Sequence, residues 1–136
     1  MAKTQAPLAT HARAIEALYA TGHWLLSQER IAQAVVVFRA MIHVAPHDER
    51  GWLALGACHE ARAQHSIALE LYGAAAEVAK TAPRCQLARA RILRSRGQLL
   101  EANEAIDHAA VLAMKLNDAE LQSLVEAERG PERGRS

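Results

Sequence analysis

Apolar residues recur at steps of three and four along most of the chain, which is the spacing of one face of an α-helix. Ile15, Leu18 and Leu25 form one such face near the start of the sequence. Proline cannot continue a helix, so Pro46 and Pro83 each mark a boundary between helices. The pattern predicts helices over residues 7–27, 31–44, 49–62, 66–79, 83–96, 99–114 and 118–129. The sequence therefore predicts an all-α protein.

Similar residues also recur every 34 positions. We call each set of residues spaced 34 positions apart a register. The registers are Gly22, Gly56 and Ala90; Ala34, Ala68 and Ala102; Phe38, Tyr72 and Ile106; and Leu18, Trp52 and Gln86. A small residue on one helix opposite an alanine on the next lets two antiparallel helices approach closely, and an aromatic ring fills the space beside them. This arrangement resembles the tetratricopeptide repeat, a helix-turn-helix unit of about 34 residues.

The resemblance implies a tetratricopeptide-repeat solenoid, with three helix-turn-helix repeats plus a C-terminal capping helix. We expect a single domain over residues 1–136, with repeats at about 15–48, 49–82 and 83–116 and the capping helix at about 118–129. Gly130 and Pro131 should end that helix and leave a disordered tail over 130–136. Trp52 is expected to be buried between the helices of the first two repeats, because its register is that of the consensus aromatic residue.

Composition and charge limit the classes of partner that the protein is expected to bind. The 136 residues are 51% hydrophobic and carry a formal net charge of +1, which gives no reason to expect a nucleic acid or an anionic membrane as partner. No apolar run approaches the roughly 20 residues that span a bilayer, so membrane insertion is not expected. The first 20 residues include His11, Arg13 and Glu16, unlike a secretory signal. Cys58 and Cys85 do not make a disulfide framework, and we expect a cytoplasmic protein.

Motifs that carry chemistry are absent from the sequence. It has no phosphate-binding glycine-rich loop and no GxSxG motif, and we expect neither an enzyme nor a bound cofactor. His43 and His47 are separated by Pro46 and do not share a helix face, so no metal site is expected. Cys58 is best interpreted as a small buried apolar residue.

Residues 48–60 read DERGWLALGACHE, and this run resembles the signature of one bacterial family. It is similar to the tetratricopeptide-repeat chaperones of type III secretion that hold hydrophobic translocator proteins, whose central repeat reads close to D-x-R-x-W/Y/F-L-G-L-G-A-C. The spacing of Ala68 and Tyr72 and the Pro83-Arg84 pair are also family-like. This chain departs from the pattern at Ala54, which replaces a glycine. Glu29 and Ala63 are further departures, because glycine is common where they stand.

The resemblance implies a cytoplasmic chaperone that binds an extended segment of a secreted translocator and keeps it soluble and competent for export. Family members bind that segment in a concave groove and often form homodimers through N-terminal helices. A needle-subunit co-chaperone of the same secretion system has this fold too and stays an alternative. A generic tetratricopeptide scaffold is another, although the clamp for a C-terminal carboxylate uses Lys and Asn where this chain has Tyr19 and His23.

The first helix of each repeat should line the concave surface of the solenoid. Projecting the 34-residue register onto these helices predicts the cargo-binding residues: Glu16, Tyr19, His23 and Leu26; Arg50, Leu53, Ala57 and Glu60; and Arg84, Leu87, Arg91 and Arg94. The arginines of the third set form either a solvated helix face or a clamp for an acidic or C-terminal carboxylate partner.

Overall fold

The computed structural model describes residues 2–79 and 81–133, with side chains for residues 9–79 and 81–130. This part of the chain contains helices and turns only. The helices are α1 (Ala2–Ser27), α2 (Ile31–Val44), α3 (Glu49–Ala61), α4 (His65–Val78), α5 (Pro83–Ser95), α6 (Leu99–Leu116) and α7 (Ala119–Arg133).

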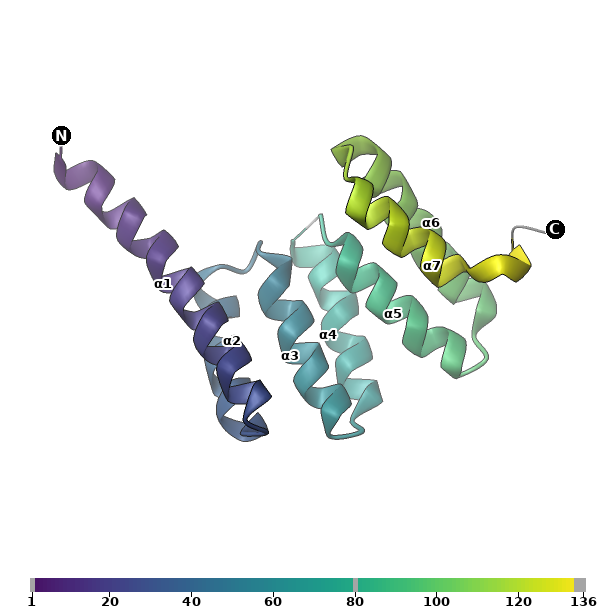
Figure 1. Cartoon of the computed structure of the whole chain (residues 1–136), viewed down its shortest axis with the longest axis horizontal. Helices are drawn as coiled ribbons and strands as arrows, with labels where there is room; N and C mark the ends of the chain where they lie inside the picture. Colours follow the sequence, from purple (N-terminus) through teal and green to yellow (C-terminus); the bar gives the residue numbers. More distant parts are fainter. Residues whose placement is uncertain (1, 80, 134–136) are drawn as a thin grey trace.

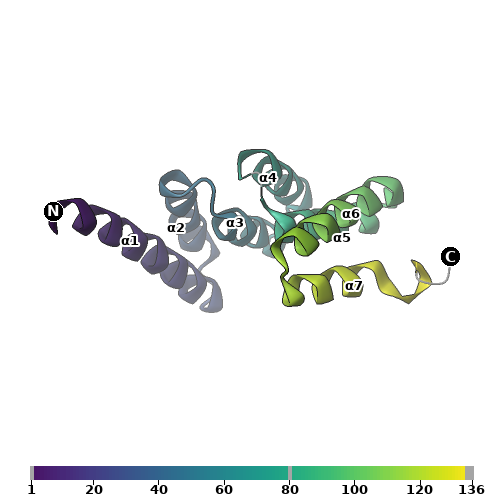
Figure 2. The same ribbon diagram turned by 90° about the horizontal axis from the view of Figure 1, so that it is seen from above.

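The helices follow one another as antiparallel pairs along a curved array (Figure 1). Each of α1, α3 and α5 packs on the helix that follows it, and α3, α5 and α7 each also pack on the helix before. The odd-numbered helices contact one another in series, whereas α2, α4 and α6 have no Cα atoms within 8 Å of each other. Viewed from above, α2, α4 and α6 lie on one side and α1 and α7 on the other, with α3 between them (Figure 2). The odd-numbered helices therefore form the closely packed inner layer, and the expected solenoid fold is confirmed.

Within the first two pairs, a glycine of the first helix meets an aromatic ring of the second. A Cβ atom at Gly22 would collide with the ring of Phe38, and one at Gly56 would collide with the ring of Tyr72. Both rings are buried, with exposed fractions of 0% and 1%. Glycine is required here because the ring occupies the volume of a side chain.

The turns inside the three pairs share one geometry. Each pair's first helix is closed by a backbone hydrogen bond over five residues, as in the bond of 2.8 Å from the Gln64 N–H to the carbonyl of His59. The residue before the donor adopts a left-handed conformation, with φ of 60° at Glu29, 58° at Ala63 and 77° at Gly97. The first two turns therefore use the geometry that glycine favours without having glycine.

The N-termini of α3 and α5 are stabilised by side-chain carboxylates, and one of these hydrogen-bond acceptors comes from the preceding pair of helices. Asp48 caps α3 by accepting a hydrogen bond from the Arg50 N–H at 3.1 Å. The first residue of α3, Glu49, reaches the start of α5, where its carboxylate accepts from the N–H groups of Arg84 at 3.1 Å and Cys85 at 3.2 Å. No side chain at the N-terminal boundary of α5 itself makes such a bond.

Two expectations need correction. Trp52 is half-buried rather than buried, and it packs against the cluster that α4 and α5 share, not between the first two repeats. Its indole N–H bonds to the carbonyl of Pro46 at 2.9 Å, which holds one edge of the ring toward the surface. The last helix begins at Ala119 and extends to Arg133, with a break at Gly130 (φ 72°), so residues 130–133 are not the structureless tail expected. Residues 134–136 lie outside the described residues.

Candidate functional site

The inner layer carries every predicted cargo-binding residue, because all twelve lie on α1, α3 or α5. At the α1–α3 junction the guanidinium of Arg50 donates hydrogen bonds to Glu16, at 2.8 and 3.1 Å, and to Asp48. It also lies 4.7 Å from the centre of the Tyr19 ring, within cation–π range. These hydrogen bonds from Arg50 hold the pKa of both carboxyl groups below their usual values.

The α3–α5 junction has the same design. The Arg91 guanidinium donates to both oxygens of Glu60, at 2.7 and 2.8 Å. The buried Tyr72 hydroxyl donates to the same carboxylate at 2.6 Å. The hydrogen bonds from Arg91 and then Tyr72 outweigh partial burial and lower the pKa of Glu60. Glu60 therefore ties the inner surface to the core of the second pair.

The α5–α7 junction completes the series. Arg84 lies 3.5 Å from carboxylate oxygens of Asp118 and of Glu120, and Arg94 lies 3.4 Å from Glu128. All four arginines predicted to line the groove thus already have carboxylate partners within the protein. An incoming acidic group would have to displace one of these partners, so neither a bare solvated face nor an open carboxylate clamp describes this surface.

A pocket of about 310 Å³ lies on the inner layer between α3, α5 and α7. Its lining residues are Leu53, Arg84, Leu87, Ala88, Arg91, Leu124, Ala127 and Glu128. Four of them were predicted from the repeat register, whereas Ala88 and the three residues from α7 were missed. Leu124 is 41% exposed, so α7 presents an apolar side chain to this pocket while Leu121 and Val125 enter the core. Leu87 is 8% exposed and belongs mainly to the core, which leaves it a smaller contact surface than expected.

The remaining predicted residues lie outside this pocket. The ring of His23 packs edge-on against two aromatic rings. Its centre lies 4.5 Å from the centre of the Tyr19 ring and 5.3 Å from that of the Phe38 ring. Leu26 is half-buried against the core of the first pair, and Ala57 is exposed. The predicted set therefore divides into a first-repeat part, a central charged part and the pocket beside α7.

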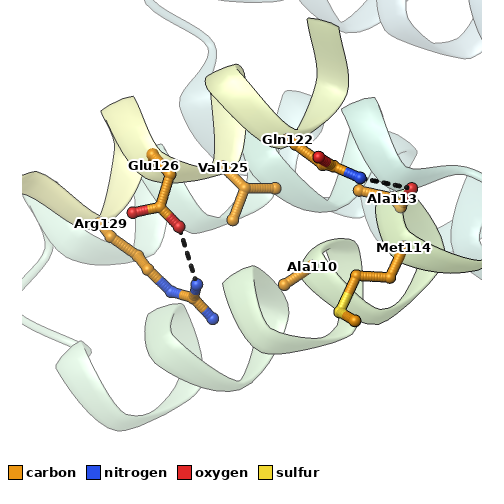
Figure 3. A pocket seen from close by; sticks show the side chains of 7 residues that line it. All are labelled: Ala110, Ala113, Met114, Gln122, Val125, Glu126 and Arg129. Carbon is orange, nitrogen blue, oxygen red and sulfur yellow. Dashed lines mark hydrogen bonds and ion pairs between the residues drawn. The ribbon is translucent and has the colours of Figure 1, made fainter. Parts of the chain in front are cut away.

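Another pocket, of about 410 Å³, opens between α6 and α7 (Figure 3). Glu126 is the eighth residue of α7, the place that Gly56 has in α3 and Ala90 in α5. There it bonds to Arg129 at 3.3 Å (Figure 3). A charged pair thus replaces the small residue that close helix packing requires, as in a solenoid's polar cap. This face of α7 is therefore not built to receive a further helix of the repeat type.

Groups that could support chemistry are not gathered within residues 2–79 and 81–133. No cluster of three or more His, Cys, Asp or Glu residues suited to a metal ion is found there. Cys58 and Cys85 are free and buried, and burial raises the pKa of both thiols. Thiols of this kind are poor nucleophiles at neutral pH. None of the helices described is both long and apolar enough to cross a membrane.

No protein-family model matches the sequence, and no curated protein matches it. Solved structures do match. The type III secretion translocator chaperone SycD of Yersinia enterocolitica is 29% identical, with a TM-score of 0.72 over 83% of this chain and 85% of that chain. SycD in complex with a peptide of the translocator YopD is 28% identical, with a TM-score of 0.63 over 84% and 91%.

PcrH, a Pseudomonas aeruginosa protein, in complex with the chaperone binding region of PopB is 26% identical, with a TM-score of 0.71 over 84% of this chain and 93% of that chain. The chain thus resembles type III secretion translocator chaperones over most of its length, and the resemblance expected from the sequence is confirmed.

Proposed function

We propose that this protein is a cytoplasmic type III secretion chaperone that binds an extended segment of a hydrophobic translocator on its inner layer. It acts by binding and not by catalysis, and it keeps the translocator soluble and competent for export. The observation that carries the proposal is the similarity to SycD and PcrH. SycD was solved in complex with a peptide of the translocator YopD, and PcrH in complex with the chaperone binding region of PopB.

The pocket between α3, α5 and α7 supports an apolar anchor for the cargo. Leu53, which is half-buried, and Leu124, which is exposed, supply apolar surface from α3 and from α7, and Ala88 leaves room between them. Two arginines line the pocket, and both have carboxylate partners: Arg91 is paired with Glu60, and Arg84 with Asp118 and Glu120. They therefore add little uncompensated charge. An uncharged side chain inserted here would bury apolar surface without breaking an ion pair. We therefore infer that apolar and backbone contacts, rather than acidic groups, dominate cargo binding.

The formation of a homodimer is supported by the face of α1 that points away from the rest of the solenoid. Gly51, Ala54 and Cys58 of α3 are buried against the preceding pair, and one period earlier α1 has Ala17, Ala20 and Trp24. These three residues are exposed because no pair precedes α1 among the described residues, and Trp24 is 55% exposed. A second copy of the chain that covers Trp24 would give a homodimer.

Leu53→Glu tests the cargo site. The full-length variant should keep its helical circular dichroism and bind the translocator of the same secretion system at least tenfold more weakly in calorimetric titration, because a charge would be buried in the pocket. Val36→Glu is the matched control, since Val36 is 65% exposed on α2, in the outer layer. Equal affinity of folded Leu53→Glu and wild type would show that cargo does not use this pocket.

A further inference from the structure

The outer layer has a groove that the proposed cargo site does not use. It lies between α4 and α6, which have no Cα atoms within 8 Å of each other, and α5 forms its floor. The groove has a volume of about 590 Å³ and is lined by Glu70, Gly73, Ala74, Ala76 and Glu77 of α4, Gln86 and Arg89 of α5, and His108 of α6.

The floor of this groove is polar where the preceding repeat is apolar. Gln86 has the place of Trp52, one period earlier, and Arg89 has the place of Leu55. On the opposite wall His108 has the place of Ala74. Three polar residues thus replace apolar residues of the preceding repeat at one site. Departures of this kind from packing rules are expected where a protein binds something.

Gln86 is the clearest sign of a missing partner. The residue is buried, with 7% of its surface exposed, and its Nε2 lies 3.0 Å from Nδ1 of His108. Its Oε1 has no hydrogen-bond partner among the described residues. A buried amide oxygen without a donor is unfavourable and rare in folded proteins. Because one imidazole nitrogen bonds only one end of the amide, the other end still lacks a donor. Oε1 has less than 1 Å² of accessible surface, so the side chains around it must move aside before a group from outside donates to it.

The α4 wall of the groove indicates which kind of ligand would supply that donor. Gly73, Ala74 and Ala76 have little or no side chain, so a polypeptide backbone could approach α4 closely. Glu70 and Glu77 are exposed two helical turns apart on the same helix, and neither forms an ion pair within the described residues. This contrasts with the inner layer, where carboxylates such as Glu60 are held by arginine.

We propose that the groove between α4 and α6 binds an extended polypeptide segment with a basic side chain, independently of the inner-layer cargo site. A backbone N–H of the segment donates to Oε1 of Gln86, and a neighbouring carbonyl accepts from Arg89. A lysine or arginine of the segment pairs with Glu70 or Glu77. The protein would then hold a second polypeptide on its outer face while the inner layer holds cargo.

The first test uses full-length, ¹⁵N-labelled protein and two blocked tripeptides, N-acetyl-Ala-Lys-Ala-N-methylamide and its counterpart with Glu in place of Lys. The lysine peptide should give saturable chemical-shift changes at the Gln86 side-chain amide and at the backbone amides of Gly73 and Glu77. The glutamate peptide should give at least fivefold weaker binding. Equal responses to both peptides, or none at Gln86, would overturn the proposal.

Variants separate recognition from folding. The double variant Glu70→Gln, Glu77→Gln changes two exposed residues and should weaken the lysine peptide at least fivefold, whereas Glu29→Gln, in the first turn, should leave its affinity unchanged. Gln86→Met removes the buried oxygen while keeping the size of the side chain. It should melt no lower than wild type but lose the peptide response. If Gln86→Met melts clearly lower and still binds the peptide, the amide is a structural element only and the groove is not the site proposed.

Discussion

The turn between α3 and α4 makes a specific prediction about stability, because Ala63 adopts a left-handed conformation with φ of 58°. The equivalent residue one period later, Gly97, has φ of 77° in a turn closed by the same kind of hydrogen bond. Replacing Ala63 with glycine should keep the turn and remove the strain between its Cβ atom and the backbone. We therefore expect Ala63→Gly to be more stable than wild type.

The magnitude follows from two opposing effects. A left-handed conformation costs a residue with a side chain about 1–2 kcal/mol, whereas glycine loses about 0.4–1 kcal/mol more conformational entropy on folding than alanine. The net gain in the free energy of unfolding is about 0.5–1 kcal/mol, which should raise the melting temperature of a chain of this size by about 2–5 °C.

Urea unfolding followed by circular dichroism measures this difference. Gly97→Ala is the reverse experiment and should lose a similar amount. Ala40→Gly is the control for glycine in general, since Ala40 is exposed inside α2, and it should lose about 1 kcal/mol. A less stable Ala63→Gly together with an unaffected Gly97→Ala would refute the argument from backbone strain.

Three further predictions concern packing, acid and association. Gly56→Leu should lower the free energy of unfolding by about 1–3 kcal/mol in urea titrations, because its side chain would collide with Tyr72; a variant as stable as wild type would contradict this close packing. The folded-state pKa of Glu60 lies below its ordinary value of 4.5, so its contribution to stability is present above about pH 4.5 and is lost as pH falls through the lowered pKa. Thermal melts from pH 7 to pH 3 should therefore show a smaller acid-induced loss for Glu60→Gln than for wild type, and equal losses would exclude this role. Trp24→Glu should shift the protein toward monomer in light-scattering chromatography, and an unchanged mass distribution would exclude the α1 face as a dimer interface.

Contacts inside a repeat were predictable from the sequence, whereas contacts between distant side chains were not. The registers of Gly56 and Tyr72 predicted their contact, because local helix pairing fixes it. The pairing of Arg91 with Glu60 depends on long side chains whose reach no spacing reveals. The α7 wall of the inner pocket was missed because α7 was interpreted as a capping helix, and the register was projected only onto the first helix of each repeat. By its place in the helix Leu124 corresponds to Ala88, which was not among the predicted residues either.

Glu49 has a consequence for how the molecule unfolds. Its carboxylate belongs to the second repeat, yet it supplies the hydrogen-bond acceptor for the first N–H groups of the third. A fragment beginning at Pro83 would lack that acceptor, and the start of its first helix would fray. Adjacent units of a solenoid couple through such interfaces, as neighbours do in a one-dimensional Ising chain. The third unit should therefore open together with the second in hydrogen exchange, and not as an independent segment that peels away from the end.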